Sequence, residues 1–203
     1  MDSTSANVSA SSDLGAFVRA EFEEHRAVCE GVQEGLAPSL GSILDLAERS
    51  IRSGGKLLLI GNGGSAADAQ HIAAELVIRY REDRVPIAAI ALTTDSSTLT
   101  ACGNDLGFDN LFARQVEALG RSGDTLIAIS TSGKSANVIS ALRQARAMKL
   151  HTVGFTGADG GNMCELCDAL LVVPSRTTAR VQEMHIFVAH VLCKALETKL
   201  GLV

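Results

Sequence analysis

Five short apolar runs alternate along the chain with segments whose apolar residues recur at helical spacing. The runs are Lys56–Ile60, Pro86–Leu92, Asp124–Ile129, Thr152–Phe155 and Ala169–Val173. Near-continuous apolar strands of this kind are typical of a parallel sheet that is buried on both faces. Parallel strands also need crossover helices, which cover those faces. The pattern therefore predicts an α/β fold, a three-layer sandwich around a five-stranded parallel sheet.

Helical spacing also marks both ends of the chain. The first predicted helix carries its apolar residues at Leu14, Phe17, Val18 and Phe22. A second helical stretch, from about Leu40 to Ile51, follows Pro38, which we expect to separate the two helices. The last stretch, Thr178–Leu200, is long and amphipathic, and a terminal helix of this length often packs against a neighbouring subunit. We therefore expect N-terminal helices, a long C-terminal helix and an oligomer.

Composition narrows the possible ligands. The chain has 203 residues, 46% of them hydrophobic, which is enough to bury a core without disulfides or structural metals. The net charge of −5 leaves no basic footprint for a polyanion, and an aromatic content of 3% leaves few rings to stack on bases or sugars. We therefore expect no nucleic-acid partner, and we expect any sugar to be held by hydrogen bonds.

The N-terminal segment and the hydropathy pattern bear on localisation. Residues 1–12 are rich in Ser and Ala and lack the basic start and apolar stretch of a signal peptide. We expect them to form a flexible N-terminus before a single domain at residues 13–203. No apolar run approaches the roughly 20 residues that a membrane-spanning helix needs. These features predict a cytoplasmic protein without a membrane partner.

Five cysteines are scattered along the chain, which suits a reducing compartment. Cys164 and Cys167 have the spacing of a redox or metal motif, but no second pair stands nearby to complete a four-thiolate site. We interpret them as small core residues at the end of a short helix.

A cluster of hydroxyl residues follows the third predicted strand. Ser130, Thr131, Ser132 and Ser135 lie between this strand and a helix that we expect to begin near Ala136. In doubly wound sheets, ligands bind outside the carboxyl ends of the strands, and a helix N-terminus favours an anion. The alternative is an ordinary turn in which Ser135 is the N-cap. The density of hydroxyls favours a phosphate cradle, although the spacing is not that of a nucleotide P-loop.

A glycine-rich loop follows the first predicted strand. Its sequence, Gly61-Asn62-Gly63-Gly64-Ser65, lets the backbone approach a ligand but lacks the spacing of a dinucleotide site. On the helix after this loop, His71 and Glu75 are four residues apart and therefore lie on one face, which suits metal ligation or proton transfer. A solvated helix face is the alternative interpretation.

The C-terminal helix offers further candidates. Gln182 and His190 are eight residues apart, about 80° around the helix axis, while Glu183 and His190 align slightly better. His185 equally fits a histidine that is satisfied within its helix. Periodicity does not choose among these residues. The residues alone therefore predict a phosphate pocket with His and Glu groups nearby and leave the chemistry open.

Taken in order along the chain, four segments resemble a known family. Gly61–His71, Asn104-Asp105, Ser130–Gly133 and Arg180–Glu183 form a series that is similar to the sugar-isomerase (SIS) domain family, and within it to the branch that isomerises sedoheptulose 7-phosphate. The resemblance covers nearly the whole chain from about residue 14. It implies a flavodoxin-like sheet and a homotetramer whose active sites lie between subunits.

The resemblance also implies an activity and a set of site residues. The family branch is an aldose–ketose isomerase that converts D-sedoheptulose 7-phosphate into D-glycero-D-manno-heptose 7-phosphate through an enediol, the first step toward the heptose of lipopolysaccharide cores. Glu75 and His190 match its acid–base pair, and His71, Glu75, Gln182 and His190 match its zinc ligands. The residues that match its substrate contacts are Asn62, Gly63, Gly64, Glu75, Asn104, Asp105, Ser130, Thr131, Ser132, Ser135 and Gln182.

A second function stands beside this one. Some proteins of the family resemble the isomerases over most of their length yet act as binding proteins, such as the branch that associates with the bacterial replication initiator. That branch lacks the acidic residue at the position of Glu75 and the histidine at the position of His190. Both residues are present here, which favours the isomerase.

Overall fold

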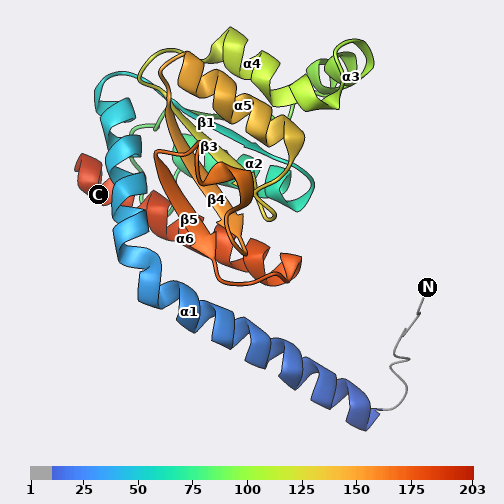
Figure 1. The fold of residues 1–203 in the computed structure, drawn as a ribbon. Helices are drawn as coiled ribbons and strands as arrows, with labels where there is room; N and C mark the ends of the chain where they lie inside the picture. Colours follow the sequence, from blue (N-terminus) through green and yellow to red (C-terminus); the bar gives the residue numbers. More distant parts are fainter. Residues whose placement is uncertain (1–10) are drawn as a thin grey trace.

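The computed structural model describes residues 11–203, and its centre is a five-stranded sheet (Figure 1). Every strand runs parallel to its neighbours, in the order β2-β1-β3-β4-β5. The strands are β1 (Leu57–Gly61), β2 (Ala89–Ala91), β3 (Thr125–Ser130), β4 (His151–Gly157) and β5 (Ala169–Val173). The predicted parallel α/β sheet is thus confirmed. Residues 1–10 of the predicted flexible segment 1–12 lie outside the described residues.

The strand bounds follow the apolar runs except at one edge of the sheet. The run Pro86–Leu92 forms only the three-residue strand β2, which pairs with β1 alone and has no neighbour on its other side. β4 is longer than its predicted range because it pairs with both β3 and β5. The other edge strand, β5, matches its predicted run Ala169–Val173, so an edge position alone does not shorten a strand.

Helices cover both faces of the sheet and complete the three layers. α1 (Ser11–Arg52), α2 (Gly64–Val77) and α6 (Thr178–Leu200) pack on one face, and α3 (Ser96–Asp105), α4 (Leu111–Leu119) and α5 (Ala136–Ala147) pack on the other. Two short 3₁₀ helices, η1 (Phe108–Asn110) and η2 (Gly161–Met163), lie in the connections. Along β1, Leu57 and Leu59 belong to the first core and Leu58 and Ile60 to the second, because successive side chains of a strand point to opposite faces.

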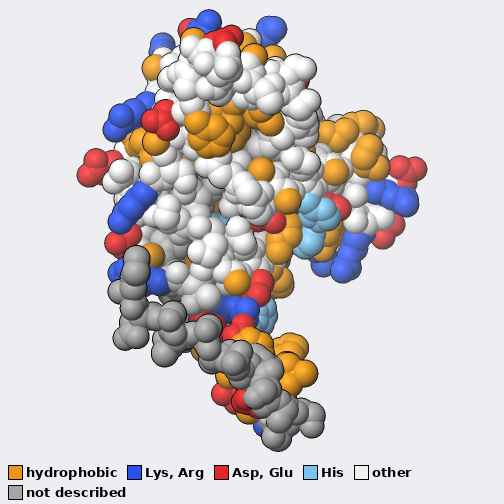
Figure 2. All heavy atoms as spheres, turned by 90° about the vertical axis from the view of Figure 1, so that its right-hand side faces the viewer, with side chains coloured by type: hydrophobic (Ala, Val, Ile, Leu, Met, Phe, Trp, Pro, Cys, Tyr) orange, Lys and Arg blue, Asp and Glu red, His pale blue; other side chains and the backbone are white. Residues whose placement is uncertain are grey.

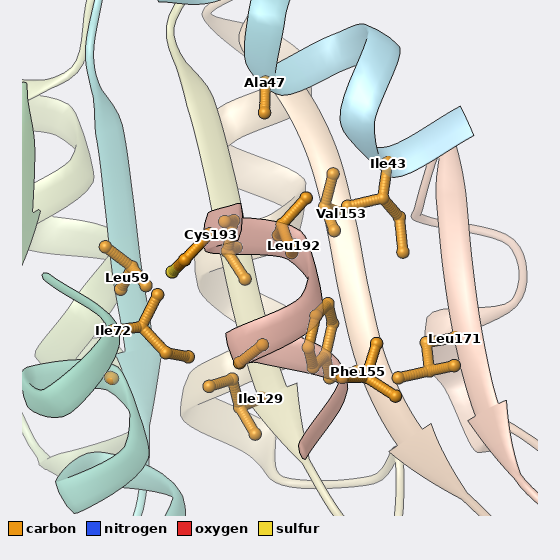
Figure 3. Close-up of a cluster of buried hydrophobic side chains, with 14 of the residues drawn as sticks. Ile43, Ala47, Leu59, Ile72, Ile129, Val153, Phe155, Leu171, Leu192 and Cys193 are labelled. Atoms are coloured by element: carbon orange, nitrogen blue, oxygen red, sulfur yellow. The ribbon is translucent and has the colours of Figure 1, made fainter. Parts of the chain in front are cut away.

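The first core joins α1, α2 and α6 to the sheet. In Figure 3, Ile72 of α2 lies beside Leu59 of β1, and Leu192 of α6 lies beside Val153 of β4. This packing places α2 and α6 beside each other on one face, which decides the geometry of the site described below.

The N-terminal region forms one helix where two were predicted. α1 spans 42 residues and contains Pro38, which we expected to separate two helices. Pro38 lacks the N–H that would complete the helical hydrogen bond, so the helix bends where its colour passes from blue to lighter blue in Figure 1 instead of ending. The hydroxyl of Ser39 donates to the Leu36 carbonyl at 3.0 Å. The second half packs Ile43 and Ala47 into the core, and this packing outweighs the local cost of the proline.

The interpretation of the paired cysteines holds for one of them only. The side chain of Cys167 is half-buried against the core under α4 and α5, and burial raises the pKa of its thiol to about 12. Cys164 is exposed, so its interpretation as a core residue was wrong. The turn after η2 directs the two side chains differently.

No helix among residues 11–203 is both long enough and apolar enough to cross a membrane.

The core contains one fully buried histidine, His185 of α6. Its Nε2 donates to the Thr156 carbonyl at 3.1 Å, and its ring lies 5.8 Å from the Phe155 ring, centroid to centroid. Nδ1 is buried without a hydrogen-bond partner among the described residues. Burial lowers the pKa of His185 from 6.5 to about 4, so the folded protein holds this ring neutral.

We expect stability to fall with acidification through this residue. Between pH 6.5 and 4 the unfolded chain protonates His185 whereas the folded chain does not, which lowers the free energy of unfolding by about 3 kcal/mol from pH 7 to pH 4. His185→Phe should remove this part of the pH dependence. It should also lower the free energy of unfolding by about 1 kcal/mol at every pH, because the hydrogen bond to the Thr156 carbonyl is lost. Urea unfolding of both proteins at several pH values measures the difference. An equal pH dependence in the two proteins would contradict the assignment.

Candidate active site

Two loops meet at the carboxyl ends of β1 and β3, where the direction of the strand order reverses. The Asn62 amide, directly after β1, donates to the Asn137 side-chain oxygen at 2.8 Å, and the Asn137 amide donates back at 2.9 Å. Asn137 is buried in the first turn of α5. This reciprocal pair fixes the glycine-rich loop against the hydroxyl loop.

The hydroxyl loop leaves its side chains available to a ligand. Ser135 is at the N-cap position of α5, as the alternative interpretation supposed, but its side chain makes no capping hydrogen bond. Its hydroxyl instead lies 3.0 Å from that of Ser130 at the end of β3. Ser132 is exposed, and its Oγ accepts from the Lys134 N–H at 3.2 Å, its one hydrogen bond within residues 11–203. The hydroxyls therefore gather beside the free N–H groups of a helix N-terminus, the arrangement that suits an anion.

Gly133 allows this loop to approach the β4–η2 connection. Its φ is +65°, and a Cβ atom there would lie 2.2 Å from the Gly160 carbonyl oxygen. Thr131 accepts from the Gly157 N–H at 3.1 Å, which joins the same two loops. A side chain at position 133 would therefore displace the loop that carries the hydroxyls.

A hollow of about 200 Å³ opens beside the hydroxyl loop and adds two cations that sequence reasoning missed. Lys134 and Arg176 line it together with Thr131, Ser132, Asp159 and the first residue of α6, Thr178. A hydrogen bond from the Gly161 N–H, and then the positive charges of Lys134 and Arg176, lower the pKa of Asp159. Lys134 stands within the hydroxyl cluster and was detectable there, whereas Arg176 reaches the hollow only through the fold.

The candidate acid–base residues come together between α2 and α6. The Nε2 atoms of His71 and His190 are 2.8 Å apart, and their rings meet edge to face. Glu75 lies one turn after His71, with its Oε1 atom 3.7 Å from His71 Nε2. One of the two imidazoles must donate to the other in this contact. His71 and Glu75, which are four residues apart in the sequence, are thus joined by His190, 119 positions after His71.

Gln182 and Glu183 face different parts of the molecule. Gln182 lies against the start of α2, because a Cβ atom at Gly64 would be 2.5 Å from its Nε2. Glu183 faces α1, where its Oε2 atom is 2.7 Å from His25 Nδ1. Within the described residues, no hydrogen bond joins either side chain to His71 or His190. Of the two periodicity candidates, Glu183 therefore belongs to the contact with α1, and Gln182 to the glycine-rich loop.

Asn104 and Asp105 lie apart from this group. They end α3, both are exposed, and the Asn104 amide donates to Asp105 at 2.7 Å. Asp68, in contrast, lies on α2 with a buried carboxylate oxygen that has no hydrogen-bond partner among the described residues. Burial raises the pKa of Asp68, and the charge of His71 opposes this effect.

The predicted zinc ligands meet in part. Two imidazoles and a carboxylate are donors that zinc prefers, and His71, Glu75 and His190 supply them at one place. Gln182 is directed elsewhere, toward Gly64. As the side chains stand, residues 11–203 hold no group of three or more His, Cys, Asp or Glu residues arranged to bind a metal ion.

Comparison with known proteins identifies the family of this chain. The SIS domain family matches residues 22–157. A phosphoheptose isomerase from Bradyrhizobium sp. (strain BTAi1) is 56% identical over 177 residues, which cover 87% of this chain and 89% of the relative. The solved structure of phosphoheptose isomerase GmhA from Neisseria gonorrhoeae is 44% identical, with a TM-score of 0.87 and coverage of 91% of this chain and 99% of that one.

A phosphoheptose isomerase from Francisella tularensis has the same fold at 35% identity and a TM-score of 0.87, covering 90% of this chain and 97% of its own. These similarities confirm the predicted fold and the predicted class of enzyme, and they do not favour the replication-partner alternative. The chain therefore belongs to the phosphoheptose isomerases of the SIS domain family, which are aldose–ketose isomerases.

Proposed function

We propose that this isomerase converts D-sedoheptulose 7-phosphate with the phosphate in the hydroxyl loop and the reacting carbons between α2 and α6. The observation that carries the proposal is the position of His71, which lies close to Glu75 on α2 and meets His190 of α6. α2 begins at Gly64, beside the hydroxyl loop, and His71 lies about 10 Å further along its axis. This spacing suits an extended seven-carbon sugar phosphate.

The chemistry requires one proton to move between carbons and another between oxygens. A base removes a proton from C1 of the ketose, an enediol forms, and a proton returns to C2, while O1 loses a proton and O2 gains one. We assign the carbon proton to His190 and the oxygen proton to Glu75. His71, in contact with both, holds the tautomer of His190 through the Nε2–Nε2 contact.

The phosphate end does no chemistry and supplies binding energy. Ser130, Ser132 and Ser135 would donate hydroxyl hydrogen bonds, and Lys134 and Arg176 would add positive charge at the edge of the same loop. Asn62, Gly63 and Gly64 would contact the sugar between the two ends. Binding energy at the phosphate then fixes the reacting carbons against the acid–base pair.

We also propose that the enzyme binds zinc through His71, Glu75, Gln182 and His190, with Gln182 turning away from Gly64 to complete the set. The donor types of this set support the proposal. When bound, the ion would act as a Lewis acid toward the sugar oxygens or have a mainly structural role. Because a lone pair bonded to zinc cannot accept a proton, Glu75 and His190 would have to be released from the ion before they act as the acid–base pair. Elemental analysis of the purified protein tests it: we expect zinc in the natural chain and less in His71→Ala, with a melting temperature that falls on chelation. Purified protein that contains no zinc, and whose melting temperature does not change when zinc is added, would contradict the proposal.

The exposed arm of α1 supports a homotetramer. Leu14, Phe17 and Phe22 are 51%, 51% and 68% exposed on one side of a helix that projects from the domain (Figures 1 and 2). Apolar stripes of this size are usually covered by a partner. A second copy of the chain would bury them and would bring further residues to a site that is open in one chain. Sedimentation of Phe22→Glu against the natural chain tests this, since loss of the stripe should dissociate the assembly.

The structure also supports the proposed compartment and the proposed domain organisation. The thiols of all five cysteines are free, which supports a reducing, cytoplasmic compartment. Both cores pack on one sheet, which supports a single domain at residues 13–203. The proposed partners are the sugar phosphate and further copies of the chain, without nucleic acid or membrane.

Replacing either acid–base residue should stop the reaction without unfolding the protein. We expect Glu75→Gln and His190→Ala each to lower kcat with sedoheptulose 7-phosphate by about 100-fold to 10,000-fold, because general acid–base catalysis contributes in this range. Circular dichroism and melting curves check the fold. Glu117→Gln, an exposed residue of α4, is the matched control and should leave turnover unchanged. Normal turnover by either site variant would refute the assignment.

The phosphate loop should act on binding rather than on the chemical step. We expect Ser132→Ala to raise KM about tenfold with kcat nearly unchanged, because one hydrogen bond to a charged phosphate is lost. Ser140→Ala is the control, because Ser140 lies within α5 and outside the hydroxyl loop. A lower kcat at unchanged KM in Ser132→Ala would argue against phosphate binding there.

A further inference from the structure

Arg84, in the connection from α2 to β2, forms a buried ion pair with Glu197 of α6 that the proposed reaction does not use. Arg84 and Glu197 have side chains only 1% and 3% exposed. Arg84 Nε donates to Glu197 Oε1 at 2.8 Å, and its Nη2 is also 2.8 Å from that oxygen. Glu197 belongs to the last turns of α6, so this contact joins the connection to α6.

The same guanidinium also binds the end of α2. Arg84 Nη1 donates to the Leu76 carbonyl at 2.7 Å, and Nη2 donates to the Glu75 carbonyl at 2.9 Å. Carbonyls in the last turn of a helix lack partners within the helix, and Arg84 satisfies two of them. The Arg84 side chain therefore connects Glu75, through its backbone carbonyl, to α6.

Tyr80 extends this connection to His190. Its backbone N–H donates to Glu197 Oε1 at 3.2 Å, and its half-buried ring lies 5.6 Å from the His190 ring, centroid to centroid, at an angle of 34°. Glu197 follows His190 by seven residues, which places both on the same side of α6. The ion pair and the acid–base pair thus share one helix–helix interface.

We propose that Tyr80, Arg84 and Glu197 form a brace that positions the acid–base pair for catalysis. Arg84 and Glu197 set the separation of Glu75 and His190 by joining α2 to α6, and the Tyr80 ring sets the orientation of the His190 imidazole. The three are positioning residues, and the inference rests on the proposed function. A misplacement of about 1 Å in such a pair reduces the chemical step by up to 100-fold.

Tyr80 provides the sharpest test because its ring contacts His190 and lies near the surface. We expect Tyr80→Leu to lower kcat with sedoheptulose 7-phosphate about tenfold, with KM and melting temperature nearly unchanged, and Tyr80→Phe to retain kcat because it keeps the ring. Arg84→Lys keeps the charge but loses the paired hydrogen bonds, and we expect a similar loss of kcat. Arg114→Lys, an exposed arginine paired with Glu117, is the control and should be unaffected.

A second measurement separates the brace from the activity. The rate at which diethyl pyrocarbonate modifies His190, followed by peptide mass spectrometry, should rise severalfold in Tyr80→Leu and stay constant in Tyr80→Phe. Natural protein that does not isomerise the sugar would refute the proposed function, while this rate would still test the contact. The brace is refuted if Tyr80→Leu retains full kcat, if Tyr80→Phe loses as much as Tyr80→Leu, or if the modification rates agree.

Discussion

The packing of α2 beside α6 on one face of a parallel sheet is the constraint on which the rest of the site depends. Because all five strands run in one direction, their carboxyl ends meet at one edge, and each following helix begins there. α2 begins at the glycine-rich loop and α6 begins beside the hollow of the hydroxyl loop. The two helices then run away from this edge side by side, and His71 meets His190 between them.

The site consequently has two ends with different physical character. The proposed phosphate end consists of hydroxyls, a helix N-terminus and two exposed cations, an environment that suits a dianion. The reacting end consists of titratable side chains that lie between contacts at either end of α2. Gln182 packs against Gly64 at its start, and Arg84 binds its last carbonyls.

The N-terminal helix has two roles along its length. Its second half buries Ile43 and Ala47 in the core, while the start of the helix projects, and polar contacts further along join it to α6. Arg180 donates to the Glu21 carbonyl at 2.9 Å, and Glu183 contacts His25. Within residues 11–203 the apolar stripe on the arm is exposed, which is the observation that supports the proposed assembly of copies.

The sequence by itself determined the features that depend on local pattern. The apolar runs specified the strands and their parallel arrangement, and the bounds of the C-terminal helix were predicted to the residue as Thr178–Leu200. The ordered glycine, serine and Gln182-Glu183 segments specified the family. Local pattern misjudged Pro38, because the packing of Ile43 and Ala47 stabilises a helix that continues through the proline.

Only the tertiary structure decided which side chains act together. Spacing on α6 left Gln182 and Glu183 equivalent, whereas packing directed one toward Gly64 and the other toward α1. The contact between His71 and His190, the cation Arg176 and the buried pair of Arg84 with Glu197 all join residues remote in sequence. Periodicity reports only how each helix is divided into faces, while the neighbours of each face are set by how the helices pack on the sheet.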